Sequence, residues 1–404
     1  MKILIVNKFL YPNGGSETYI FEIGKQLQKM GHEVQYFGME HEGRVVGNHA
    51  ESYTSNMDFH TGKLAKLLYP FKIIYSKEAR QKIRVVLDDF KPDVVHLNNF
   101  TYQITPSILY EIRKFEKKNN HKVKIVATVH DPQLVCPNHM LIHGTTGKPC
   151  ELCLSGQFRY CAKGKCIHGS TVKSILGMVE SRLYRSLHAY RMIDTVICPS
   201  YFIESKLKAN PDIDGRTKML RNFISVSEPT GEKADKPYVL YFGRYSEEKG
   251  IHTLVKAAKE LPEIPFVFAG NGPFEDEVNA VSNIDNKGFT TGSALADLIA
   301  NASFSLIASE CFENCPFSVM ESQMLGTPVI GANIGGIPEL IREGVDGELF
   351  KSGSVEALKT VIRNLYNDTE KIGRYAKACG EISYDLPETY CKKLIEIYME
   401  EYNS

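Results

Sequence analysis

Short apolar runs that alternate with amphipathic segments are the feature that most restricts how this chain of 404 residues can fold. In the first half, apolar runs rich in β-branched residues occur at 3–7, 33–37, 94–97, 124–128 and 195–198. Segments with helical periodicity lie between them, at 18–30 and at 76–90. This alternation is typical of α/β proteins with a parallel sheet.

The same pattern starts again after a polar stretch at 227–237, whose Pro, Gly and charged residues predict a linker. Strand candidates follow at 239–242, 266–269, 304–308 and 328–331, and helix candidates at 252–260, 295–301 and 317–325. We therefore expect an N-terminal domain at 1–222 and a C-terminal domain at 228–386, each a doubly wound, Rossmann-like sheet. Ligands bind such sheets at the carboxyl ends of the strands.

The segment at 387–404 predicts one more amphipathic helix, because Tyr390, Leu394, Ile397 and Tyr398 recur at helical spacing. The pattern leaves open whether this helix packs on the second domain or crosses back to the first.

The formal net charge is zero, but the two halves of the chain have opposite charges. Residues 1–222 contain 32 Lys and Arg against 20 Asp and Glu, whereas residues 223–404 contain 16 against 28. Domains that attract each other and domains with different partners both fit this split. No apolar segment reaches the ~18–20 residues of a membrane span, so we expect a cytoplasmic protein with reduced cysteines.

The positions of two glutamates in the second domain predict that they bind hydroxyl groups of a ligand. Glu313 follows the strand candidate at 304–308, and Glu321 lies on the next helix, with seven residues between the two. A carboxylate only accepts hydrogen bonds, so it can hold a pair of neighbouring hydroxyls. The helix opens with Asn314, Cys315, Pro316 and Phe317. Its free N–H groups suit a diphosphate, and Pro316 suits its first turn, although taken alone the glutamates also fit ordinary helix-terminal charges.

This stretch resembles the signature of glycosyltransferase family 4, which is a Glu, seven residues and a second Glu. The match continues through residues 326–329 (Gly-Thr-Pro-Val) and 335–339 (Gly-Gly-Ile-Pro-Glu), although a Phe-Gly pair is commoner in the family where this chain has Asn314-Cys315. The resemblance covers nearly the whole chain and is weakest at 40–90 and 135–190. It implies the GT-B fold, in which two facing Rossmann-like domains enclose the active site in the cleft between them.

The resemblance also implies the reaction. A retaining enzyme would move a sugar from a nucleoside diphosphate sugar to an acceptor hydroxyl in polysaccharide, glycolipid or other glycoconjugate synthesis, with no cofactor required for catalysis. The alternatives are a sugar-nucleotide epimerase of the same architecture and a non-catalytic protein that binds sugar nucleotides.

Arg244 and Lys249 follow the strand candidate at 239–242. An Arg supplies a planar fork and a Lys a point charge, and together they can neutralise a diphosphate. In isolation the segment also fits a solvated charged loop. The family resemblance assigns these two cations to the donor phosphates, Glu313 to the sugar hydroxyls and Glu321 to the ribose.

In the first domain, Gly14 and Gly15 follow the first strand candidate, and His130 follows the strand candidate at 124–128. Glycines allow a ligand to approach the backbone closely, and the segment does not have the GxGxxG form of dinucleotide-binding proteins. The resemblance implies that the glycine loop touches the transferred sugar or the acceptor. It implies that His130 contacts the donor sugar near its sixth carbon.

In the second domain, Asn271, Gly272 and Leu295 resemble family positions beside the nucleotide base, and so does Phe289.

Five of the ten cysteines fall within residues 136–166, namely Cys136, Cys150, Cys153, Cys161 and Cys166. A connection of this length is unusual in a compact domain, and a structural zinc would order it. Free thiols and disulfides are the alternatives. If zinc binds, the expected ligands are Cys136, Cys150, Cys153 and Cys166.

Basic residues are interleaved with apolar ones at 63–84 and at 157–191. Such segments can lie on anionic membranes, which would suit a lipid-linked acceptor at the inner face of the membrane. A solvated surface over a core helix is the alternative. No nucleic-acid recognition motif accompanies the charge.

Overall fold

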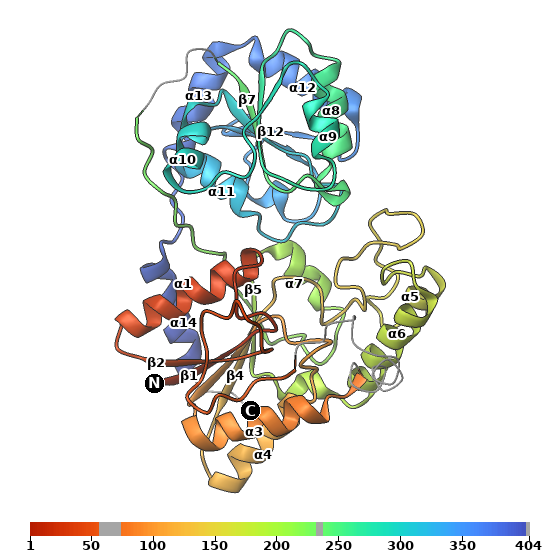
Figure 1. Ribbon diagram of the computed structural model, residues 1–404, viewed down its shortest axis with the longest axis vertical. Helices are drawn as coiled ribbons and strands as arrows, with labels where there is room; N and C mark the ends of the chain where they lie inside the picture. Colours follow the sequence, from red (N-terminus) through yellow and green to blue (C-terminus); the bar gives the residue numbers. More distant parts are fainter. Residues whose placement is uncertain (56–73, 232–236, 401–404) are drawn as a thin grey trace. The chain divides into compact units, whose positions relative to one another are not determined.

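The computed structural model describes residues 1–55, 74–231 and 237–400 (Figure 1). The chain divides into two compact units. Unit 1 comprises Met1–Arg221 and Pro387–Ser404, and unit 2 comprises Asn222–Leu386. The basic residues at 63–72, which belong to the segment that could lie on an anionic membrane, fall outside the described residues.

Unit 1 contains a sheet of six parallel strands in the order β2-β1-β3-β4-β5-β6. The strands are β1 (Lys2–Val6), β2 (Glu33–Phe37), β3 (Val94–Leu97), β4 (Lys124–Thr128), β5 (Thr195–Cys198) and β6 (Thr217–Met219). The first five confirm the strand candidates, because a mostly apolar run that becomes buried in the sheet is a strong local signal. Strand β6 was not predicted, since its three residues are only half-buried and form no apolar run.

The helices of unit 1 are α1 (Gly15–Lys29), α3 (Lys77–Phe90), α4 (Ile108–Asn119), α5 (Arg159–Lys163), α6 (Thr171–Ser186), η1 (Ala189–Met192), α7 (Tyr201–Leu207) and α14 (Pro387–Met399). Local signals set the ends of α3, where the Ser76 side chain accepts a hydrogen bond from the N–H of Ala79 and Lys91 adopts a left-handed conformation before Pro92. Helix α14 lies beside α1, so the chain returns to unit 1 after unit 2 (Figure 1).

Unit 2 contains a second sheet of six parallel strands, in the order β12-β11-β10-β7-β8-β9. The strands are β7 (Val239–Phe242), β8 (Phe266–Ala269), β9 (Ile284–Asn286), β10 (Phe304–Ile307), β11 (Val329–Ala332) and β12 (Gly347–Phe350). The helices are η2 (Glu247–Lys249), α8 (Ile251–Lys259), α9 (Glu275–Asn279), α10 (Gly292–Asn301), α11 (Phe317–Met324), η3 (Ile337–Glu339), α12 (Val355–Tyr366) and α13 (Thr369–Cys379).

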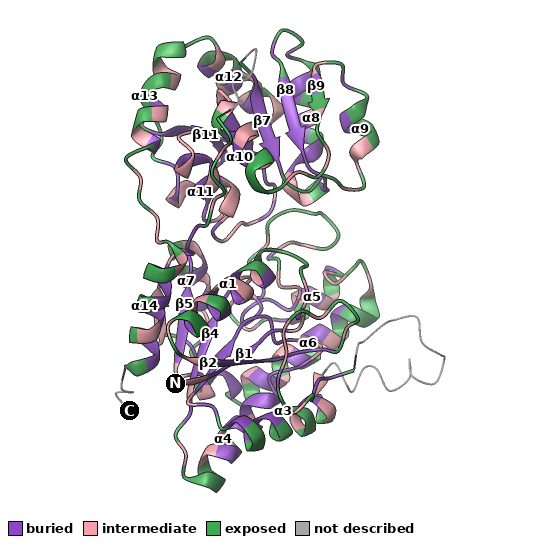
Figure 2. Ribbon diagram, turned by 60° about the vertical axis from the view of Figure 1, so that its left-hand side comes forward, coloured by how far each residue is buried: buried purple, intermediate pink, exposed green. Residues whose placement is uncertain are grey.

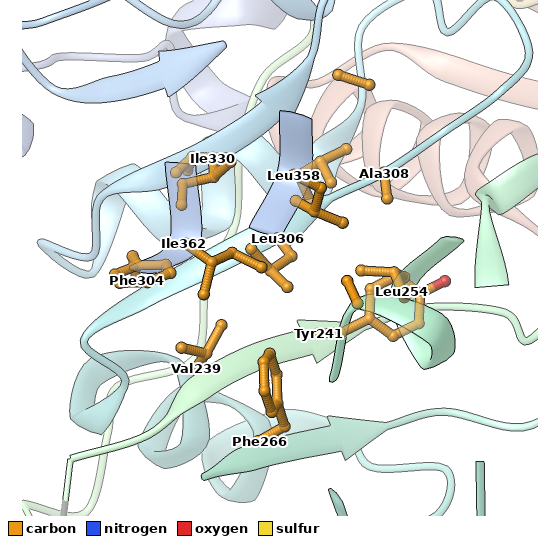
Figure 3. Close-up of a cluster of buried hydrophobic side chains, with 14 of the residues drawn as sticks. Val239, Tyr241, Leu254, Phe266, Phe304, Leu306, Ala308, Ile330, Leu358 and Ile362 are labelled. Atoms are coloured by element: carbon orange, nitrogen blue, oxygen red, sulfur yellow. The ribbon is translucent and has the colours of Figure 1, made fainter. Parts of the chain in front are cut away.

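The core of unit 2 lies between its sheet and its helices. Figure 3 shows Val239 and Tyr241 of β7 in a cluster with Leu358 and Ile362 of α12. Both aliphatic side chains of α12 are fully buried, and each contributes about 1.5–3 kcal/mol through burial. Figure 2 shows the same arrangement throughout, with buried strands and helices that expose one face.

Strand order reverses between β1 and β3 in unit 1 and between β7 and β10 in unit 2. The loops that leave the carboxyl ends of these neighbouring strands diverge, so each sheet offers a place for a ligand there. In the described part of the chain, no helix combines the length and the apolar character needed to cross a bilayer.

Candidate functional site

Arg244, Lys249 and Glu313 lie where the strand order of unit 2 reverses. Strands β7 and β10 pair directly. Arg244 and Lys249 lie in the loop and short helix after β7, and Glu313 lies in the loop after β10. The structure thus brings Glu313 to the sheet edge that holds Arg244 and Lys249, although 64 positions separate Glu313 from Lys249.

Lys249 and Glu313 form an ion pair, in which Lys249 Nζ lies 2.5 Å from Glu313 Oε1. Ser309 also donates a hydrogen bond to Oε1, at 2.7 Å. Burial alone would lower the pKa of Lys249 and raise that of Glu313, but their mutual attraction outweighs it, so the pKa of Lys249 is raised and that of Glu313 lowered. Both groups are therefore charged at neutral pH. Among the described residues, Glu313 Oε2 has no hydrogen-bond partner.

Two glycines allow these loops to approach each other. Gly250 has φ +72°, and a Cβ there would lie 2.0 Å from the carbonyl oxygen of Ala308. Gly335 has φ +62°, and a Cβ there would lie 2.4 Å from the carbonyl oxygen of Glu313. The N–H of Gly336 donates to that same oxygen at 2.7 Å. A side chain at either glycine would displace the Lys249–Glu313 pair.

Helix α11 begins beside Glu313. Pro316 adopts an extended conformation at the N-cap and the first helical residue is Phe317, so the prediction that Pro316 lies in the first turn was wrong by one residue. The helix has no side-chain cap and no acidic residue in its first turn, which leaves backbone N–H groups available to an anion. Cys315 is buried with its Sγ 3.7 Å from Met320 Sδ, so its side chain packs in the core. Asn314, by contrast, is half-buried.

Glu321 lies on α11, one turn beyond Phe317. Its side chain is half-buried and has no hydrogen-bond partner among the described residues. Burial raises its pKa to about 7. A partly desolvated carboxyl without a donor is suited to hydroxyl groups of a ligand.

The loops after β7 and β8 pack backbone against backbone. The N–H of Tyr245 donates to the carbonyl of Asn271 at 2.7 Å, and a Cβ on Gly272 would lie 2.3 Å from the carbonyl oxygen of Tyr245. Tyr241 Oη donates to the carbonyl of Arg244 at 2.8 Å, while the Arg244 side chain is exposed. Arg244, Asn271 and Gly272 therefore lie at the same edge of the sheet, beyond the carboxyl ends of β7 and β8.

Leu295 and Phe289 have different environments. Leu295 is half-buried and packs against a core cluster that contains Tyr238, Leu240 and Phe242. Phe289 is 73% exposed, which is the highest value among the large apolar side chains of the described residues. Of the two, Phe289 is the one available to stack on a base.

In unit 1, the glycine loop at 13–17 is fixed to the ends of β1 and β3. Both Gly14 and Gly15 are exposed. Buried Glu17 accepts hydrogen bonds from Asn7 Nδ2 at 2.8 Å and from Ser16 Oγ at 2.9 Å, and Asn99 Nδ2 donates to Ser16 Oγ at 3.0 Å. These polar contacts were not predicted, because they join residues from three segments.

His130 lies just beyond β4, with its Nε2 2.9 Å from Asn98 Oδ1. Asn98 Nδ2 donates to the carbonyl of His96, so Oδ1 faces His130 and Nε2 carries the proton. Burial lowers the pKa of His130 to about 4. The imidazole is therefore neutral at pH 7. Its ring packs edge-on against Tyr19, with 4.8 Å between the ring centroids.

A buried hydrogen-bond network connects Tyr19, which packs against His130, to α14. Tyr19 Oη lies 2.8 Å from Tyr390 Oη and 3.1 Å from Thr128 Oγ1. Thr128 Oγ1 lies 2.8 Å from His96 Nε2, and His96 Nδ1 lies 2.7 Å from Tyr398 Oη. The helical spacing of Tyr390 and Tyr398 predicted the helix, but it could not predict which residues their hydroxyls contact.

The cysteine-rich segment does not support the zinc interpretation. Five thiols line one small cavity, namely those of Cys136, Cys150, Cys153, Cys161 and Cys166. Across residues 1–55, 74–231 and 237–400, however, no group of three or more His, Cys, Asp or Glu side chains is arranged to hold a metal ion. Cys153 and Cys161 instead pack in an apolar cluster with Phe158, and Cys136 Sγ donates to Asn138 Oδ1 at 2.8 Å.

Part of the predicted basic surface is neutralised. Arg84 Nη2 lies 2.7 Å from Glu111 Oε2, and Arg80 pairs with the same carboxylate. The basic residues of α3 therefore contribute less net charge than the sequence alone indicates.

Comparison with known families gives two matches. Residues 13–228 match the family described as Glycosyltransferase Family 4. Residues 223–381 match the family described as Glycosyl transferases group 1.

Individual relatives are distant. The chain is 32% identical over 172 residues to sulfoquinovosyl transferase of Arabidopsis thaliana, a match that spans 41% of this chain and 32% of that protein. It is 22% identical over 403 residues to N-acetyl-alpha-D-glucosaminyl L-malate synthase of Bacillus anthracis, which covers 93% of this chain and 91% of that enzyme.

Solved structures resemble the whole chain. Sucrose-phosphate synthase of Thermosynechococcus elongatus has a TM-score of 0.70 at 17% identity, with 98% of both chains covered. Anabaena HepE in complex with UDP-glucose has a TM-score of 0.64 at 18% identity, with 98% of this chain and 99% of HepE covered. These likenesses establish that the two units form a GT-B fold.

Proposed function

The chain belongs to glycosyltransferase family 4, and from that membership we propose that it transfers a sugar from a nucleoside diphosphate sugar to an acceptor hydroxyl. The observation that carries the proposal is the Lys249–Glu313 ion pair where the strand order of unit 2 reverses. It places a fixed cation and a fixed carboxylate beside the uncapped start of α11.

In this proposal Arg244, Lys249 and the first N–H groups of α11 hold the donor diphosphate. Negative charge grows on the leaving diphosphate as the bond to the sugar breaks. Cations and dipoles already fixed at that place stabilise the charge without reorganising, which lowers the barrier. Arg244 is exposed and has no ion-pair partner among the described residues, so it is available for a phosphate.

Glu313 would bind hydroxyls of the transferred sugar. Lys249 and Ser309 both contact Oε1, which holds the carboxylate in one orientation. Oε2 then accepts hydrogen bonds from the sugar and positions the ring for attack. Glu321 would hold the ribose hydroxyls, whose O–H groups supply the donors that its carboxylate lacks in the unliganded protein.

We assign to unit 1 the roles that the family resemblance gives its residues. His130 would contact the donor sugar as a neutral imidazole and not as a general base. Gly14 and Gly15 would lie against the transferred sugar or the acceptor, because an exposed glycine backbone lets a ligand approach closely. Asn271, Gly272 and Leu295 would border the base of the nucleotide, and Phe289, whose side chain is exposed, would stack on it.

We propose retention of anomeric configuration, by front-face substitution in which the leaving phosphate takes the acceptor proton. The resemblance of the Glu313 to Glu321 spacing to a retaining family supports this course. Catalysis then needs no metal or other cofactor. The acceptor would be a sugar or a lipid-linked glycan, and a cytoplasmic site at the inner face of the membrane would suit it.

A thermal-shift screen against UDP-, GDP-, ADP- and CMP-sugars tests the proposal. The correct donor at about 100 times its Kd should raise the unfolding midpoint of unit 2 by several degrees. The Arg244→Ala variant should lose that shift without losing stability. If no sugar nucleotide stabilises the protein, the proposal fails.

Product analysis separates the alternatives. A transferase releases the nucleoside diphosphate only as acceptor is consumed. Release of an epimerised sugar nucleotide without acceptor would indicate an epimerase. Binding without turnover across broad acceptor panels would indicate a non-catalytic binding protein.

A further inference from the structure

Helix α6 exposes three aliphatic residues, Val172, Ile175 and Val179, and buries three polar or small ones, Ser174, Gly177 and Glu180. The residues that it buries are Ser174, Gly177, Glu180 and Tyr184. Val172, Ile175 and Val179 are 66%, 42% and 39% exposed. Their spacing places them on one face of the helix, opposite the buried one. The helix of a globular domain normally has the reverse arrangement.

Specific contacts fix this orientation. Ser174 Oγ accepts a hydrogen bond from the N–H of Ile167 at 2.9 Å, and Tyr184 Oη donates to the carbonyl of Ile74 at 2.8 Å. A Cβ on Gly177 would lie 2.4 Å from Ile167 Cδ1, so the helix backbone packs closely there. The helix cannot rotate to bury the apolar stripe (Val172, Ile175 and Val179) without breaking these contacts.

The segment that contains the apolar stripe is rich in basic residues. Residues 157–191 contain seven Lys and Arg but a single acidic residue, Glu180. Glu180 is buried with its Oε1 unpaired, and burial raises its pKa to about 8, so it adds little negative charge to the surface. Arg182 on α6 is exposed, and so are Lys163 and Lys165 at the end of α5, which packs beside α6 (Figure 1).

We propose that α6 docks unit 1 on an anionic lipid surface. The apolar stripe would enter the interfacial region, and Lys163, Lys165 and Arg182 would lie near the headgroup phosphates. The excess of basic residues in 157–191 favours a lipid surface that carries negative charge over a neutral one. The 16 residues of α6 form a helix that lies on the membrane and does not cross it. This docking does not depend on the proposed transferase activity.

Co-sedimentation of the full chain with vesicles tests the proposal. The chain should bind phosphatidylcholine vesicles that contain phosphatidylglycerol and should bind pure phosphatidylcholine weakly. The Val172→Ser/Ile175→Ser/Val179→Ser variant should lower the partition coefficient by at least about tenfold. A matched control is Val45→Ser/Val345→Ser/Leu386→Ser, since those side chains are 59%, 46% and 55% exposed. The control should bind like the unchanged chain.

A charge-reversed variant, Lys163→Glu/Lys165→Glu/Arg182→Glu, should lose binding to the anionic vesicles while its unfolding midpoint stays unchanged. Failure of the unchanged chain to bind any vesicle would overturn the proposal, and so would equal binding by the stripe variant and its control. If the stripe variant instead converts a dimer to a monomer in light scattering, the stripe joins two copies of the chain and the lipid proposal is wrong.

Discussion

The hydroxyl of Tyr19 on α1 lies 2.8 Å from the hydroxyl of Tyr390 on α14, although 371 positions separate the two residues. Tyr19 also packs against His130 and contacts Thr128. Helix α14 therefore helps to position Tyr19, which in turn packs against His130.

The Tyr390→Phe substitution should destabilise unit 1 by about 1 kcal/mol, because it removes one buried hydrogen bond while Tyr19 keeps Thr128 as a partner. Urea unfolding followed by a probe in unit 1 measures the change. Tyr366→Phe is the control, since that hydroxyl donates an exposed hydrogen bond to the carbonyl of Pro237. Equal effects of the two substitutions would show that the Tyr19–Tyr390 contact adds no stability.

The Glu313→Gln substitution should lower kcat for sugar transfer by about 10²–10³-fold, because a neutral amide neither orients Lys249 nor accepts sugar hydroxyls as well. Steady-state kinetics measures the loss. Glu310→Gln, in the same loop, is the control, since Glu310 accepts a hydrogen bond from Thr253 and makes no contact with Lys249. If both variants keep full activity, Glu313 is not part of the reaction.

Donor binding should strengthen as pH rises through 7. Glu321 has its pKa raised to about 7 by burial, and only its carboxylate form accepts two hydroxyl hydrogen bonds, so binding the donor releases a proton. Glu313 has its pKa lowered and stays ionised over this range. Calorimetric titration at several pH values should show the dependence, and Glu321→Gln should bind weakly and lose it.

The same pKa shift has a consequence for stability. A carboxyl whose pKa rises from 4.5 to about 7 on folding binds its proton more tightly in the folded state. Its contribution to stability is therefore present at low pH and is lost between pH 4.5 and about 7 in the unliganded protein. Glu321→Gln should remove this part of the pH dependence. An unchanged pH–stability profile in the variant would contradict the assignment.

The Gly250→Ala substitution should weaken donor binding and destabilise unit 2, because the new Cβ would lie 2.0 Å from the carbonyl oxygen of Ala308. Gly344→Ala is a matched control, since Gly344 has φ +75° against +72° for Gly250 but no atom within 4 Å of its Cβ. Both variants carry the left-handed strain of about 1 kcal/mol, so the difference between them measures the close approach alone. Thermal melts with and without donor give both values.

Much of the fold follows from local pattern. Strands β7 and β8 are unbroken apolar runs, and their bounds could be predicted to the residue. Helix α6 was not predicted. Helical periodicity would bury Val172 and Ile175, whereas the structure buries Ser174 and Glu180. Tertiary contacts override periodicity there.

The candidate site, like the fold, could be predicted only in part. Arg244, Lys249 and Glu313 lie in loops after buried strands, so their shared edge follows from parallel topology. The contributions of Ser309 and Gly250 could not be predicted, since they depend on how two loops pack. The same holds for Leu295, whose side chain packs against β7 residues.

The discontinuity of unit 1 affects the order in which the protein can be completed during synthesis. Helix α14 leaves the ribosome only after all of unit 2, so Tyr19 and His96 must wait for Tyr390 and Tyr398 while residues 222–386 are made. Unit 2, by contrast, is one continuous stretch that can finish folding first. Synthesis of unit 1 begins first, but its fold is completed last, when α14 packs on α1. If the ribosome stalled before residue 387, Tyr19 and His96 would lack their hydrogen-bond partners on α14.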